Sequence, residues 1–81
     1  MNKLLVFSAP WCKPCQMMKP VLESLNSPNI IHYDLDSDTE QVDKYRVPGV
    51  PCYILVDEDG KELDMLLGLA SIETLQELLS R

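Results

Sequence analysis

The chain has 81 residues, with 13 acidic against 7 basic side chains and a formal net charge of −6 at pH 7. This length allows one small domain, which we expect to span residues 1–81. Hydrophobic residues make up 46% of the chain, which excludes a disordered polymer. No cluster of Lys or Arg is present, so the basic surface of a protein that binds nucleic acid or anionic membranes is excluded.

Cysteine usage and hydropathy favour a cytoplasmic protein. Three cysteines are an odd and sparse set, unlike the framework of a secreted disulfide scaffold. The apolar run at residues 4–9 is shorter than a signal-peptide core of about 7–15 residues, and nothing approaches the roughly 20 apolar residues of a membrane span. We therefore expect a cytoplasmic monomer with no membrane partner.

The first half of the chain alternates strand and helix patterns. Residues 3–8 form a continuous apolar run, typical of a strand buried on both faces. Helical spacing of apolar residues follows over residues 12–26, where Pro14 suits the first turn and Pro20 should kink the helix. Residues 30–35 predict a second strand, parallel to the first because a helix lies between them.

A short helix and a loop come next. Asp38, with Gln41 three positions on, looks like the N-cap of a helix that ends at Tyr45. Residues 46–51 contain two prolines and a glycine and predict a loop.

The last third of the chain predicts a hairpin and a helix. Residues 52–56 and 62–67 read as strands, joined by a turn at residues 57–60. Ser71 looks like the N-cap of a final helix with an apolar stripe over residues 72–79. The order β-α-β-α-β-β-α predicts an α/β fold in which helices flank a mixed four-stranded sheet. Its first strand should lie inside the sheet.

Cys12 and Cys15 stand where the first strand gives way to a helix. The free N–H groups and positive dipole end of a helix N-terminus favour a thiolate placed there. Open α/β sheets also place their functional sites at the carboxyl ends of strands. A Cys-x-x-Cys in this position is typical of a redox site.

The segment APWCKPC at residues 9–15 resembles the active site of the thioredoxin family. The resemblance continues at Pro20, YDLD at 33–36, KYRVPGVP at 44–51 and Gly68, and it covers essentially the whole chain. It implies a minimal thioredoxin fold of glutaredoxin size, lacking the usual N-terminal strand and helix. Similar short forms occur in archaea and bacteriophages; if the chain is encoded by a virus, the expected location is the host cytoplasm.

The resemblance implies a thiol–disulfide oxidoreductase that reduces protein disulfides. Cys12 is then the exposed nucleophile that forms a mixed disulfide, and Cys15, more buried, is the thiol that resolves it. Pro51 matches the cis-proline that faces the pair, and the backbone of Val50 is expected to pair with an extended substrate. The rest of the flat docking face would be made by Trp11, Pro48, Gly49 and Gly68.

The resemblance also implies how electrons arrive and leave. No cofactor is expected to be bound, because the redox-active disulfide between Cys12 and Cys15 carries the electrons. NADPH would supply them through a flavoprotein of the thioredoxin-reductase type, and enzymes such as ribonucleotide reductase would receive them. No metal is expected, since zinc and iron–sulfur sites usually need four ligands and residues 34–43 lack the spacing of a calcium loop.

Lys13 and Pro14 separate the two cysteines, and Lys13 departs from the glycine common in the family. One interpretation is a solvated side chain at the start of the helix. The other is an ammonium group that favours the Cys12 thiolate and makes the disulfide more oxidising.

Val6 and His32 stand where the family usually has a buried aspartate and a neighbouring lysine. His32 could exchange protons with the resolving cysteine near neutral pH. The alternatives are a structural histidine and a proton transferred to water. Cys52 follows Pro51, so strand alternation predicts that its side chain points away from the pair into the core, where it acts as a small apolar group. The alternative is a regulatory or dimer-forming thiol.

Two other functions remain open. A glutaredoxin would use glutathione, but residues 68–71 lack the paired glycines and the acid that glutaredoxins use to hold it. A thioredoxin-fold binding module would dock a larger protein through the apolar face around Trp11 and Pro51, with redox chemistry incidental.

Overall fold

The computed structural model describes residues 2–81, so the first residue of the predicted domain lies outside the described part. The predicted order of elements is confirmed. The strands are β1 (Lys3–Ser8), β2 (Ile30–Asp34), β3 (Cys52–Val56) and β4 (Glu62–Leu67). The helices are α1 (Lys13–Leu25), α2 (Thr39–Tyr45) and α3 (Ile72–Leu79). β2 ends one residue before the predicted boundary.

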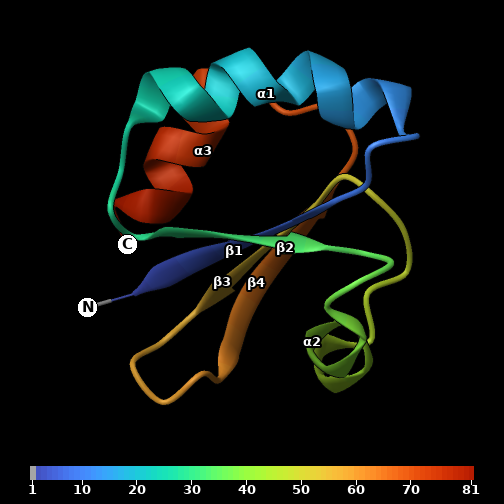
Figure 1. The fold of residues 1–81 in the computed structure, drawn as a ribbon. Coiled ribbons are helices and arrows are strands. Elements are labelled where there is room, and N and C mark those ends of the chain that lie inside the picture. Colours follow the sequence, from blue (N-terminus) through green and yellow to red (C-terminus); the bar gives the residue numbers. More distant parts are fainter. Residues whose placement is uncertain (1) are drawn as a thin grey trace.

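The strands form one sheet in the order β2-β1-β3-β4. β1 runs parallel to β2 and antiparallel to β3, and β4 pairs antiparallel with β3. α1 and α3 cover one face of the sheet, and α2 lies on the other (Figure 1). The first strand is therefore internal, as predicted, and its carboxyl end delivers the chain to the cysteine pair.

Strand alternation divides the core into two layers. Beneath α1 and α3 the buried side chains are Leu4, Val6, Met18, Leu22, Tyr53, Leu55, Leu75 and Leu78. On the side of α2 they are Leu5, Phe7, Cys52, Ile54 and Val56. Because β1 and β3 supply both layers, these two strands are buried almost throughout, which explains their continuous apolar sequences.

The ends of the helices follow local sequence chemistry. Cys12 is the N-cap of α1, and Asn26 ends that helix in the left-handed region with φ 46°. Ser71 caps α3, because its hydroxyl accepts the backbone N–H of Thr74 at 3.2 Å. Pro20 lies inside α1.

Asp38 occupies the N-cap position of α2 but does not cap the helix with its side chain, so this part of the prediction is wrong. Its carboxylate instead accepts the backbone N–H of Asp34 at 2.7 Å. The carboxylate therefore closes the β2–α2 turn instead of the first turn of the helix.

The turn between β3 and β4 is built as predicted. The carboxylate of Asp57 accepts backbone N–H groups from Asp59 and Lys61, both at 2.9 Å. Gly60 adopts φ 82°, a conformation that favours glycine. The Tyr45 hydroxyl donates to the Gly60 carbonyl at 2.9 Å and ties the turn to α2.

Candidate active site

The sulfur of Cys12 accepts a hydrogen bond from the first turn of α1. Cys12 is the N-cap, with extended backbone (φ −87°, ψ 113°), and its Sγ accepts the backbone N–H of Cys15 at 3.2 Å. The two residues form a disulfide with their Cα atoms 5.2 Å apart. When the disulfide opens, the same N–H and the helix dipole favour a thiolate on Cys12.

Both cysteines are buried, so the expectation of an exposed Cys12 beside a more buried Cys15 is wrong. The exposed fraction is 5% for Cys12 and 7% for Cys15. The two residues pack with Ala9, while Leu35 and Val50 lie against this small cluster. The Cys12 Sγ lies 3.7 Å from the Val50 carbonyl oxygen, so the loop before β3 closes over the sulfur.

The Val50–Pro51 peptide bond is cis, as expected. Pro51 itself is fully buried, so its ring cannot be part of an exposed docking face. Its carbonyl accepts the Gly68 N–H at 2.9 Å, and Gly68 has φ 83°. Pro51 therefore supports the surface from beneath, and its neighbours in the loop present the surface.

The exposed surface around the pair is largely apolar. Trp11 is 64% exposed, Pro48 is exposed, and Gly49, Val50 and Gly68 are half-buried. Sequence reasoning missed Leu67 and Leu69, which flank Gly68 and are 52% and 59% exposed. The sequence could have indicated them, because both residues are direct neighbours of Gly68. Lys13 and Pro14 are exposed in the first turn of α1.

Trp11 is held by Asp36, which the sequence singled out only as part of YDLD at 33–36. Its indole Nε1 donates to the Asp36 carboxylate at 2.8 Å, although Asp36 lies beyond the end of β2. The bond orients an otherwise solvent-exposed ring beside the cysteine pair.

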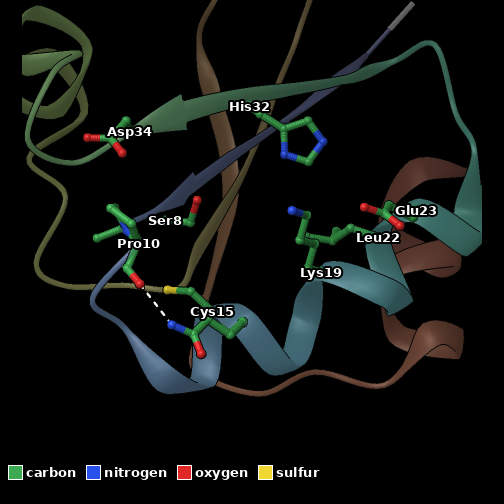
Figure 2. A pocket seen from close by; sticks show the side chains of 10 residues that line it. Ser8, Pro10, Cys15, Lys19, Leu22, Glu23, His32 and Asp34 are labelled. Atoms are coloured by element: carbon green, nitrogen blue, oxygen red, sulfur yellow. Dashed lines mark hydrogen bonds between the residues drawn. The ribbon is translucent and has the colours of Figure 1, made fainter.

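An open cleft of about 600 Å³ lies behind the disulfide. Cys15 lines it, together with Lys19 and Glu23 from α1 and His32 and Asp34 from β2. Figure 2 shows the His32 ring on the opposite wall from α1, facing the cleft that Cys15 also reaches.

Val6 and His32 are paired in the register of β1 and β2. Val6 is 1% exposed and contributes only apolar surface beneath α1, while His32 is exposed. His32 therefore lies on the wall of the cleft and not inside the core.

Cys52 points into the core on the α2 side, as predicted, and is fully buried. Burial, and to a smaller extent the charge of Glu62, raises the pKa of its thiol to about 11. Its side chain lies on the sheet face opposite Tyr53 and away from α1. Cys52 is therefore an apolar packing group.

Within residues 2–81, no helix is long and apolar enough to cross a membrane. The same residues contain no group of three His, Cys, Asp or Glu side chains placed to hold a metal ion.

Residues 2–81 match the family model described as a thioredoxin-like domain. The chain belongs to this family. It is 38% identical to a thioredoxin of Chlamydia trachomatis over 82 residues, covering 96% of this chain and 79% of that protein. Its identity to a thioredoxin of Bacillus subtilis is 39% over 80 residues, covering 93% and 76% of the two chains.

Solved thioredoxins share the fold. A mutant thioredoxin from Halobacterium salinarum superposes with a TM-score of 0.86 at 33% identity, covering 98% of this chain and 72% of that one. With its Cys12–Cys15 pair, the chain is a thiol–disulfide oxidoreductase. Thioredoxins carry no prosthetic group, use a redox-active disulfide and are reduced by NADPH through thioredoxin reductase. Its partners are thus a reductase and proteins that contain disulfides.

Proposed function

We propose that Cys12 is the attacking thiolate and Cys15 the resolving thiol when this protein reduces protein disulfides. The observation that carries this assignment is the hydrogen bond from the Cys15 N–H to the Cys12 Sγ at 3.2 Å. Only Cys12 is the N-cap of α1, so only its sulfur receives the stabilisation of the helix N-terminus as a thiolate.

The reaction then has two exchange steps. The Cys12 thiolate attacks a substrate sulfur, the substrate S–S bond breaks, and one substrate thiolate leaves to take a proton. Cys15 next loses its proton and attacks the Cys12 sulfur, which releases the second substrate thiolate and re-forms the Cys12–Cys15 disulfide. Two electrons pass from the protein to the substrate.

The docking face is proposed to consist of Trp11, Pro48, Gly49, Val50 and Gly68, with Pro51 as its buried support. The half-buried backbone of Val50 lies beside the Cys12 sulfur, where an extended substrate could pair with it. Because this surface is largely apolar, it suits partially unfolded or exposed disulfide segments.

Lys13, Pro14 and His32 are proposed to modulate the chemistry. The exposed ammonium of Lys13 lies next to Cys12 in the chain and favours its thiolate. Pro14 occupies the first turn of α1, where its missing N–H leaves the cap intact. His32 shares the cleft with Cys15, where its ring could accept the proton of the resolving thiol.

The biological setting is proposed from the family. A flavoprotein thioredoxin reductase would recharge the pair from NADPH, and ribonucleotide reductase is a representative recipient. We propose that residues 1–81 act as one monomeric domain in the cytoplasm. The family match over residues 2–81 supports the single domain.

Insulin reduction tests the assignment. Wild type should reduce insulin with NADPH and thioredoxin reductase, and Cys15→Ser should lose turnover while trapping substrate as a mixed disulfide on Cys12. Turnover only with glutathione and its reductase would indicate a glutaredoxin instead. Undiminished partner affinity with no disulfide reduction by wild type would indicate a binding module.

A further inference from the structure

Tyr53 lies directly beneath the proposed docking face. It is fully buried in β3, two residues after Pro51, and belongs to the core layer under α1 and α3. Its hydroxyl donates to the Gly68 carbonyl oxygen at 2.9 Å. The Gly68 N–H donates in turn to the Pro51 carbonyl at 2.9 Å. Both backbone polar groups of Gly68 are therefore held, one by Tyr53 and one by Pro51.

Gly68 connects β4 to the segment that leads into α3, and it adopts φ 83°. A Cβ atom built on it would meet no atom within 4 Å, so the residue is needed for its backbone conformation and not for lack of space. The two hydrogen bonds hold this turn beside Pro51, together with the pairing of Leu67 with Cys52 in the β3–β4 ladder.

We propose that Tyr53 is a positioning residue for substrate docking: through its hydroxyl it fixes Gly68, and through Gly68 it holds the loop that carries the cis-proline. This inference rests on the proposed docking face. Tyr53 does not touch the reacting sulfurs, so its effect is on the binding of extended protein substrates and not on the exchange chemistry.

The hydroxyl is suited to this task because it stays a neutral donor. Burial, with a smaller contribution from the neighbouring Cys52, raises the pKa of Tyr53 to about 12. The phenol therefore keeps its proton well above neutral pH.

The chain offers a matched control in Tyr45. Its hydroxyl also donates to a glycine carbonyl fifteen residues further on, that of Gly60, at the same 2.9 Å. This bond lies at the β3–β4 turn, at the end of β3 remote from Pro51 (Figure 1). Tyr45→Phe and Tyr53→Phe thus each remove one equivalent hydroxyl, but only the second removes it beneath the docking face.

The experiment uses reduced protein mixed with excess substrate, so no reductase is involved. Second-order rate constants are measured for insulin, a protein disulfide, and for hydroxyethyl disulfide, a small one. For Tyr53→Phe we expect the insulin rate constant to fall roughly three- to tenfold, the effect of one ordinary hydrogen bond. The small-disulfide rate constant should stay at the wild-type value. Tyr45→Phe should match wild type with both substrates.

Amide hydrogen exchange supplies a second readout. The Gly68 N–H should exchange faster in Tyr53→Phe than in wild type or Tyr45→Phe. Equal insulin rate constants for the two variants, or a parallel loss with both substrates, would overturn the inference. A wild-type protein that fails to reduce insulin would instead refute the proposed function. Hydrogen exchange of the Gly68 N–H would then still test whether the Tyr53 hydroxyl holds Gly68 in place.

Discussion

The indole N–H of Trp11 donates to the carboxylate of Asp36 across a gap of 25 residues in the chain, at 2.8 Å. Trp11 precedes the N-cap cysteine of α1, and Asp36 follows β2. The bond joins the carboxyl ends of the two parallel strands, and it holds in one orientation a ring that is otherwise 64% exposed.

Removing the acceptor should free the ring and weaken docking. In Asp36→Ala we expect the rate constant for insulin reduction to fall several-fold, because an ordered apolar surface element becomes mobile. The free energy of unfolding should change by no more than about 1 kcal/mol, since the bond is exposed. Stopped-flow fluorescence of Trp11 measures both the rate and the altered ring environment. Asp36→Asn, which keeps an oxygen acceptor, should recover most of the activity; equal defects in both variants would exclude a role for the bond.

His32 should affect the rate of the resolving step. If its ring accepts the Cys15 proton through the shared cleft, His32→Ala should slow the resolution of the mixed disulfide. Rapid quenching of the mixed disulfide provides the measurement, with Lys19→Ala as a control from the same cleft. Equal resolution rates for wild type and His32→Ala would leave water as the proton acceptor.

Cys52 should make the protein less stable at alkaline pH. Its folded pKa is raised from 9.0 to about 11, so its contribution to stability is complete below pH 9 and is lost as the pH rises towards 11. Urea unfolding at pH 8 and pH 10.5 measures this effect. Between these pH values the free energy of unfolding should decrease less in Cys52→Ala than in wild type.

The burial of Cys52 has a separate consequence for thiol counting. In reduced protein, the Cys52 thiol should react with a chromogenic reagent only after denaturation, when all three thiols are counted, because Cys52 is 0% exposed in the fold. Rapid reaction of all three thiols in native protein would contradict its placement in the core.

Arg81 links the end of α3 to the edge strand. Its guanidinium donates to Asp64 at 2.7 Å and to both carboxylate oxygens of Glu77 at 3.0 Å. The hydrogen bond from Arg81, helped by the Met65 N–H, lowers the pKa of Asp64 below its ordinary 3.8. The resulting stability is present above pH 4 and is lost as Asp64 gains its proton.

Arg81→Ala should therefore lower the melting temperature slightly at pH 7 and weaken the decline of stability below pH 4. Arg81→Lys keeps the charge but not the forked geometry of the guanidinium, so its melting temperature should lie between those of wild type and Arg81→Ala. Melting curves at pH 7 and pH 3 compare the three proteins. If the melting temperature drops by the same amount between these pH values in Arg81→Ala and in wild type, the link between Arg81 and Asp64 does not contribute to stability.

The amino-acid sequence was sufficient to predict every strand and helix. Period-two and helical patterns depend on residues that are close in the chain, so they can be read without knowing what packs against them. Local sequence also sufficed to place Cys12 at a strand–helix junction and Ser71 at the start of a helix. The local order of residues also placed Cys52 in the core, since it follows Pro51 directly and strand side chains alternate.

Burial and hydrogen-bond partners between distant segments were decided by the tertiary structure. Cys12 is buried because the loop that carries Val50, 38 residues further along, closes over it. The links from Trp11 to Asp36 and from Tyr53 to Gly68 likewise join segments that no local pattern connects. The sequence shows which side chains can donate or accept hydrogen bonds. Which of them become buried, and which become partners, depends on which elements lie together once the sheet has formed.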